Sequence, residues 1–113
     1  MPDPLDVSPP SYKEVNIGFA SSFINLPCSI SIEDENYFLN LSKTGQYHLL
    51  SAVCPHMWGN IVLKDACFLC PDHGWQFDLS EGICTNGPRS RMYKISVINR
   101  QGVLFAQFPY QEM

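Results

Sequence analysis

The sequence predicts an all-β domain, and three observations support that fold class. Nine prolines and seven glycines interrupt the 113 residues, which favours turns over long helices. Apolar residues rarely recur at helical spacing and gather instead in short runs bounded by turn-forming residues. The length suits one domain, and a hydrophobic content of 45% is enough for a modest core.

The N-terminal end is expected to hold little regular structure. Residues 1–11 contain four prolines, so we predict a flexible, proline-rich tail followed by a folded domain over 12–113. Residues 12–15 are a weak strand candidate, and a short helical turn fits within 18–27.

The remaining strands are predicted from apolar runs that end at turn residues. Their expected ranges are 28–32, 37–41, 47–53, 61–63, 66–69, 74–79, 92–99 and 103–108. The first two form a hairpin with an acidic tip. The strand 47–53 leads the chain to Cys54, and the hairpin around Lys64 and Asp65 separates two motifs that carry the chemistry.

Charge and hydropathy exclude several classes of partner. A formal charge of −4 argues against a nucleic-acid partner, since no basic stripe is present. Apolar runs fall far short of the roughly 20 residues that span a bilayer. The N-terminus also lacks the basic start and apolar stretch of a signal peptide. We therefore expect a cytoplasmic protein without a membrane partner, most simply a monomer.

Two short motifs each offer one thiol and one imidazole. The first is Cys54-Pro55-His56 and the second is Cys70-Pro71-Asp72-His73. Thiolate and imidazole suit zinc or iron–sulfur chemistry and suit magnesium or calcium poorly. Zinc signatures usually place two cysteines in one arm and two histidines in the other. Mixed arms favour a binuclear cluster with two cysteines on one iron and two histidines on the other; a zinc site, or four buried residues without metal, are the alternatives.

At these residues the chain resembles the Rieske ferredoxins and the Rieske domains of oxygenases. Cys54, His56, Cys70 and His73 match the family's Cys-x-His … Cys-x-x-His motif, and GWQFDLSEGICTNGP over 74–88 is similar to the family's usual continuation. The likeness extends over roughly 30–108, with a shortened connection between the motifs. It implies one 2Fe–2S cluster per chain, held by those four residues.

The same resemblance implies an architecture. Rieske domains are antiparallel β-sandwiches with an inserted cluster-binding subdomain, which here would span about 52–88. In the family a proline-containing loop covers the cluster, and Gly87-Pro88 matches it.

Three cysteines and one histidine are left over. We expect Cys28, Cys67 and Cys84 to be buried thiols, because a disulfide framework needs an oxidising compartment. Cys67-x-x-Cys70 has the spacing of a redox dithiol, which is an alternative use of these residues. His48 lies in a predicted strand and receives no ligand role.

The resemblance implies a one-electron carrier of low potential. High-potential relatives carry a disulfide between the ligand loops, and Gly59 and Asp72 stand at the matching positions here. Trp75 replaces the hydroxyl residue of that type. Met57 and Trp58 are candidates for an apolar docking rim or for simple cover over the cluster. The leading interpretation is a ferredoxin that passes electrons from a flavin reductase to a terminal oxygenase.

Other functions remain open at this stage. An oxygenase centre needs two more histidines and a carboxylate, and only His48 is left, so this chain is not expected to be the oxygenase itself. The alternatives are a Rieske subunit or N-terminal domain of a larger hydroxylase or nitrite-reductase-like enzyme, and a structural zinc module.

Overall fold

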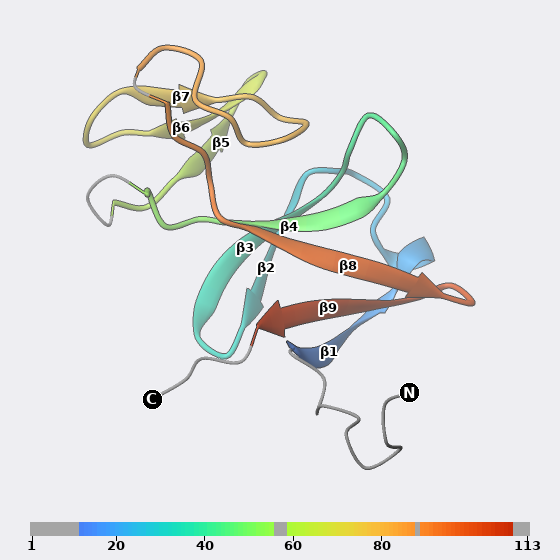
Figure 1. Ribbon diagram of the computed structural model, residues 1–113. Helices are drawn as coiled ribbons and strands as arrows, with labels where there is room; N and C mark the ends of the chain where they lie inside the picture. The colour runs from blue at the N-terminus through green and yellow to red at the C-terminus, as the bar shows by residue number, and fades with distance from the viewer. Residues whose placement is uncertain (1–11, 56–58, 88, 110–113) are drawn as a thin grey trace, which may run out of the picture.

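Two antiparallel sheets make up the domain (Figure 1). The structure is a computed structural model that describes residues 12–55, 59–87 and 89–109. The elements are β1 (Tyr12–Phe19), the 3-10 turn η2 (Ala20–Ser22), β2 (Cys28–Ile32), β3 (Glu35–Leu41), β4 (Tyr47–Ser51), β5 (Val62–Lys64), β6 (Cys67–Cys70), β7 (Trp75–Phe77), β8 (Lys94–Arg100) and β9 (Val103–Pro109). Within these residues η2 is the only helical element, which confirms the all-β prediction.

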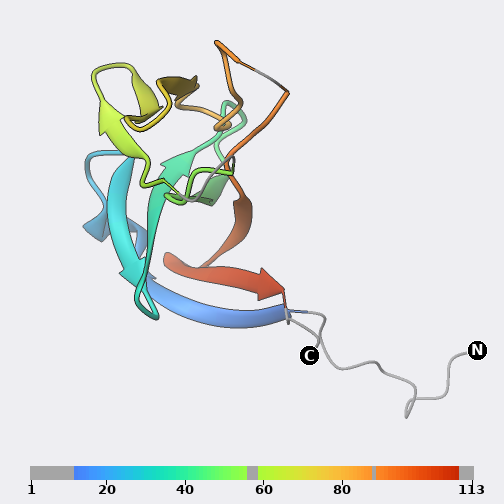
Figure 2. The ribbon, with the colours of Figure 1, turned by 90° about the vertical axis from the view of Figure 1, so that its left-hand side faces the viewer.

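The larger sheet has six strands in the order β1-β9-β8-β4-β3-β2, and every pairing is antiparallel. The smaller sheet has the order β5-β6-β7. Figures 1 and 2 show the smaller sheet stacked at one end of the larger one. Chain order explains this arrangement, because all three short strands lie between β4 and β8, which are neighbours in the larger sheet.

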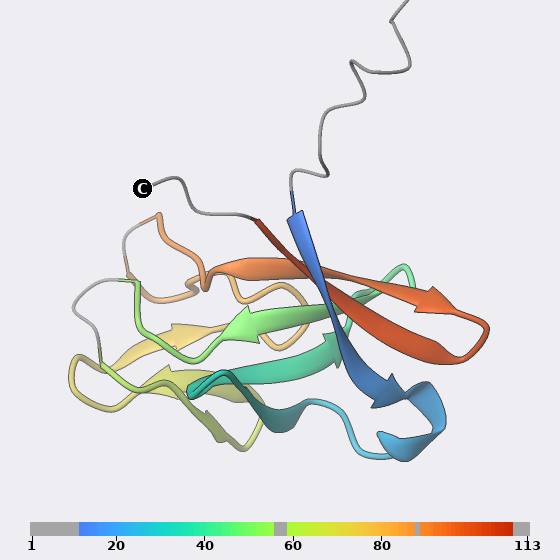
Figure 3. The ribbon, with the colours of Figure 1, turned by 90° about the horizontal axis from the view of Figure 1, so that it is seen from below.

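Strands β3 and β4 separate two hydrophobic cores. On β3, Phe38 packs into one core, whereas Tyr37 and Leu39 pack into the other. Side chains alternate across a strand, so an apolar run such as this one requires partners on both faces. The core on the Phe38 side reaches the smaller sheet, and the core on the other side is enclosed by the curled six-stranded sheet (Figure 3).

The predicted hairpin of β2 and β3 is confirmed, with a tighter turn than expected. Strand pairing runs from Cys28↔Leu39 to Ile32↔Glu35, which leaves only Glu33 and Asp34 in the turn. Both have positive φ, 51° and 68°, as a two-residue turn of the type that matches strand twist requires. Both side chains are exposed, and Glu33 forms an ion pair with Lys13 at 2.8 Å.

Strand β1 is twice as long as predicted. It spans 8 residues and pairs with β9 at the edge of the sheet. The register shifts between Asn16 and Gly18, whose φ is 116°. The bulge explains the short prediction, because a glycine inside a strand pattern usually signals its end or a bulge.

The small strands differ from their predictions by a few residues. The turn after β5 lies at Asp65 and Ala66, and β7 ends at Phe77, although a strand was predicted to residue 79. Cys70 is the last residue of β6, so it belongs to a strand end and only partly to a loop. No helix in the described ranges is long and apolar enough to cross a membrane.

Candidate metal centre

The first ligand loop begins where β4 ends. The amide of Cys54 donates a hydrogen bond to the Gly59 carbonyl at 2.7 Å, and Val53 bridges to Asn60. These bonds close the loop, and residues 56–58 between them lie outside the described residues. The prediction for His56 and the two roles considered for Met57 and Trp58 therefore stay predictions.

The second ligand loop joins β6 to β7. Cys70 and Trp75 are paired across the two strands, so the four residues between them form a hairpin turn. The amide of Gly74 donates to the Cys70 carbonyl at 2.7 Å, with a φ of 74° that suits glycine. This turn folds His73 back toward the sulfur of Cys70.

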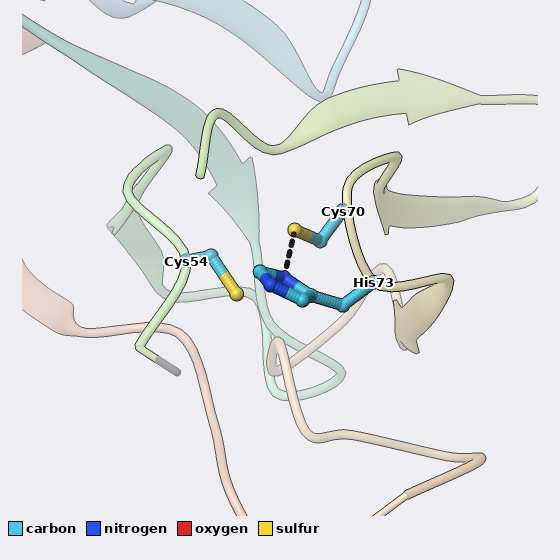
Figure 4. Close-up of side chains that lie close together, drawn as sticks. All are labelled: Cys54, Cys70 and His73. Atoms are coloured by element: carbon cyan, nitrogen blue, oxygen red, sulfur yellow. Dashed lines mark hydrogen bonds between the residues drawn. The ribbon is translucent and has the colours of Figure 1, made fainter. Parts of the chain in front are cut away.

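The two loops bring three metal-ligating side chains together. Ligand atoms of Cys54, Cys70 and His73 all lie within 4.8 Å of one another, and no other such group of three occurs in the described part of the chain. Cys54 and Cys70 are 1% and 0% exposed, whereas His73 is partly exposed. Figure 4 shows the imidazole pointing toward both sulfurs, with Nδ1 3.4 Å from the Cys70 sulfur.

The surroundings of Cys70 both oppose and favour its ionisation. Burial raises the pKa of the thiol, and the neighbouring Cys54 raises it further. The backbone N–H groups of Asp72 and His73 point at the sulfur and act in the opposite direction. A metal ion must therefore displace the proton, and the two N–H donors then serve the bound thiolate.

A third loop, residues 84–87, is fastened to the second ligand loop by Asn86. Its Nδ2 donates to the Gly74 carbonyl at 2.9 Å, and its Oδ1 accepts from the Gln76 amide at 2.8 Å. A Cβ on Gly87 would lie 3.3 Å from both the Cys84 sulfur and Trp75 Nε1, so this loop lies close against the domain. Pro88, predicted to cover the cluster, lies outside the described residues. Sequence analysis missed Asn86, although an Asn-Gly pair marks a turn.

The spare cysteines do not belong to this group of ligand atoms, although Cys84 packs against the core that contains Cys54 and Cys70. Cys28, Cys67 and Cys84 are free thiols of intermediate exposure, so the prediction of buried thiols is only partly met. Burial raises the pKa of Cys28. Cys67 and Cys70 are an odd number of residues apart on β6 and point to opposite faces. A Cys67–Cys70 dithiol therefore does not fit this strand.

A groove of about 750 Å³ opens beside the first ligand loop. Its walls include Cys54, Pro55, Arg91, Tyr93 and Lys94. Tyr93 is 56% exposed, and Lys94 forms an ion pair with Glu81 at 3.0 Å. Aromatic and cationic side chains thus line the same groove as Cys54, one of the proposed ligands. The sequence did not indicate this feature.

Comparison with known proteins decides between the metal chemistries. The Rieske [2Fe-2S] domain family matches residues 16–106, which is most of the chain. The chain belongs to the Rieske family. Rieske domains bind a 2Fe–2S cluster, and two buried thiols facing an imidazole supply three of the donors that such a cluster takes. This confirms the cluster prediction and sets the zinc module aside.

The relatives in sequence are desaturases. A cholesterol 7-desaturase of Ciona intestinalis is 42% identical over 60 residues, which is 50% of this chain and 13% of that protein. One from Drosophila melanogaster is 34% identical over 65 residues, or 54% of this chain and 15% of that protein. The Rieske chain thus spans about one seventh of these relatives.

Solved structures share the fold. The reduced complex between oxygenase and ferredoxin in carbazole 1,9a-dioxygenase has a chain with a TM-score of 0.62 and 18% identity, covering 88% of this chain and 29% of that one. A plasma-membrane Rieske protein of Synechocystis PCC 6803 gives 0.63 and 18%, covering 81% and 97%. These likenesses confirm the Rieske fold.

Proposed function

We propose that this Rieske protein carries single electrons to a terminal oxygenase, with Cys54, His56, Cys70 and His73 as the cluster ligands. The observation that carries the proposal is the meeting of two thiols and an imidazole from separate loops within 4.8 Å. When bound, the 2Fe–2S cluster supplies reversible one-electron transfer. Cys54 and Cys70 would hold it from the buried side, and His73, which is partly exposed, would hold it nearer to the surface.

The position of the ligands supports electron exit through the histidines. Both sulfurs are almost fully buried, whereas the His73 ring is partly exposed. The centroids of the His73 and Trp75 rings lie 6.5 Å apart, so an aromatic side chain lies next to the imidazole. The partly exposed edge of His73 is therefore where we propose that a partner docks.

The histidines of these 113 residues support an electron-transfer role for this segment. An oxygenase iron takes two histidines and a carboxylate, and the chain has three histidines in all. Once two are assigned to the cluster, His48 is left, and its side chain is buried in β4. We propose that oxygen chemistry occurs on a partner, that a flavin reductase supplies the electrons, and that the carrier acts in the cytoplasm as a monomer.

An electron-relay assay tests the carrier role. Purified protein is mixed with NADH, the flavin reductase of an oxygenase system and cytochrome c, and the reduction of cytochrome c is followed by absorbance. The expected result is reduction that depends on the Rieske protein and is lost in His73→Ala but kept in Cys67→Ser. Protein that contains iron and a 2Fe–2S spectrum yet relays no electrons would contradict the proposal.

A second candidate is the electron-input domain of a larger desaturase. The observation that favours it is the 42% identity with one segment of the Ciona desaturase. In that case the chain should restore product formation when it replaces the disabled Rieske segment of that desaturase in one polypeptide, and should not do so when it is added as a separate protein. Restoration only when the two are joined in one polypeptide would favour a domain over a free carrier.

A further inference from the structure

Gly59 forms a notch that is already filled from the other ligand loop. A Cβ placed on Gly59 would lie 2.8 Å from Asp72 Oδ2 and 3.0 Å from the Cys70 sulfur. Real Cβ atoms essentially never approach another atom below 3.0 Å. The Asp72 carboxylate therefore occupies the space that any larger residue at position 59 would need.

Space, and not a left-handed backbone, favours glycine at this position, because a side chain here would have to displace the Asp72 carboxylate or the Cys70 sulfur. Gly18, Gly45, Gly74, Gly82 and Gly102 have positive φ, and Gly59 does not. Its backbone therefore lies outside the left-handed region that favours glycine, and the close approach of Asp72 and Cys70 is the physical reason for a glycine here. Glycine is the usual residue where a side chain or a second backbone must come close to the main chain.

The contact joins two loops that are otherwise closed separately. The first loop is closed by the Cys54 amide on the Gly59 carbonyl, and the second by the Gly74 amide on the Cys70 carbonyl, both at 2.7 Å. Each of these bonds lies within its own loop. The carboxylate of Asp72 reaches from the second loop to the first, so its size affects how far apart Cys54 and Cys70 are held.

The carboxylate is also a negative charge beside a ligand. Asp72 Oδ2 and the Cys70 sulfur both lie close to the Cβ position built on Gly59. The distance between these two atoms is therefore less than the sum of their distances from that position. A nearby negative charge disfavours the addition of an electron, and net charge is one of the factors that set Rieske potentials. Asp72 is exposed, so solvent weakens the effect without cancelling it.

We propose that Asp72 is a positioning residue with two roles: its carboxylate sets the spacing of the two ligand loops through the Gly59 notch, and its charge lowers the reduction potential of the cluster. The inference rests on the proposed ligand assignment. It gives this chain a noncovalent link between its ligand loops and ties low potential to one replaceable side chain.

Three variants of the iron-loaded protein separate the two roles. Asp72→Asn keeps the size and removes the charge, whereas Asp72→Ala removes both. Asp65→Asn is the matched control, because Asp65 is exposed at the far end of β6 and has a φ of 54°, which asparagine tolerates. Reduction is followed by spectroelectrochemical titration, and iron release by a chelator that absorbs when it binds iron.

The charge role predicts a specific shift in the titration. At a fixed applied potential, Asp72→Asn should raise the ratio of reduced to oxidised protein by roughly three- to tenfold, whereas Asp65→Asn should change it by less than about twofold. The difference should shrink in 1 M salt, because Asp72 is exposed. Equal shifts in the two variants would overturn the charge role.

The spacing role predicts a different readout. Asp72→Ala should release iron several times faster than Asp72→Asn, and Gly59→Ala should assemble less cluster, with partial recovery in Gly59→Ala/Asp72→Ala. Equal release rates for the two Asp72 variants would overturn the spacing role. Neither outcome touches the carrier proposal, which fails only if the wild-type protein relays no electrons.

Discussion

At the scale of single residues, His73 distinguishes a Rieske site from an all-cysteine cluster. In His73→Cys a thiolate would replace the imidazole that lies 3.4 Å from the Cys70 sulfur. We expect the reduced variant to lose the Rieske EPR spectrum, whose average g lies below that of all-cysteine clusters. Low-temperature EPR of the reduced protein gives the answer, and an unchanged spectrum would remove His73 from the ligand set.

Cys67→Ser is the matched control for that experiment. Cys67 is partly exposed and lies on the opposite face of β6 from Cys70. Iron content should be retained, with a stability cost of at most about 1–3 kcal/mol for a hydroxyl that lacks a partner. Loss of iron in this variant would mean that the cysteine ligands are assigned wrongly.

His48 is a second residue whose chemistry can be tested. Its side chain is 1% exposed, and neither ring nitrogen has a hydrogen-bond partner among the described residues. Burial lowers the pKa of His48 from 6.5; Lys94 and Arg91 lower it further, and Glu81 opposes them. The unfolded chain therefore binds the proton more readily than the folded one, so this histidine destabilises the fold as pH falls below about 6.5.

The prediction for His48 is a change in the pH dependence of stability. Below pH 6.5 the wild type should lose up to about 1.4 kcal/mol per pH unit relative to His48→Leu. At pH 8 the variant should be equally stable or more so, because leucine leaves no polar atom unpaired. Thermal melts from pH 8 to pH 5 measure this; parallel curves for the two proteins would show that His48 does not titrate on unfolding.

At the scale of elements, the loop at 84–87 depends on one side chain. Asn86 makes hydrogen bonds of 2.9 and 2.8 Å to Gly74 and Gln76, and so ties this loop to the turn that carries His73. Asn86→Ala should cost about 1–3 kcal/mol of stability and should also increase the rate of iron loss. Chelator-trapped iron release and thermal melting report the two effects.

Asn99→Ala serves as the control for Asn86→Ala. Asn99 Oδ1 accepts the Gly102 amide at 2.8 Å in the β8–β9 turn, away from both ligand loops. It should lower the melting temperature without faster iron release. If both variants lost iron at the same rate, global stability would explain the effect and the loop would have no special role.

Elements whose contacts lie within a few residues in sequence are the ones that the sequence predicts. The β2–β3 hairpin and the two ligand motifs are of this kind. Asn86 acts 12 residues from Gly74 in sequence, and the Gly59 notch is filled from the second loop. Contacts of this kind depend on how strands return across the fold, and no local pattern contains that information.

At the scale of the whole molecule, the strand pairing of the larger sheet likewise cannot be predicted from local sequence patterns. Strand β1 pairs with β9 at the other end of the chain, and this pairing extends β1 past the bulge at Gly18. The burial of His48 likewise comes from its place in β4, between β3 and β8, where it stands beside Asn40 and Ser96. A strand's apolar pattern predicts that it is buried, but the identity of its neighbours is a property of the assembled sheet.

The distribution of charge over the molecule is uneven. The chain has a net charge of −4 and only seven basic residues, yet Arg89, Arg91 and Lys94 lie within six positions of one another. Arg91 borders both the groove beside Cys54 and a smaller hollow of about 400 Å³ that Arg89 also lines. Two carboxylates lie nearby: Glu81 forms ion pairs with Arg91 and Lys94, and Glu35 lines the same groove. The three cationic side chains outnumber these two carboxylates, which gives the groove wall and the adjoining hollow a net positive field.

This field should speed electron transfer to negatively charged oxidants. We expect ferricyanide to oxidise the reduced Arg89→Glu variant roughly three- to tenfold more slowly than the wild type at low salt. The difference should fade near 1 M salt, where the Debye length is about 3 Å.

Lys43→Glu is the control, because it changes the net charge equally in the turn at the other end of β4. It should have a much smaller effect on this rate. Oxidation by a cationic cobalt complex should instead become faster in Arg89→Glu. Stopped-flow absorbance measures these rates. Equal effects of the two variants would show that only net charge matters and that no local field guides the partner.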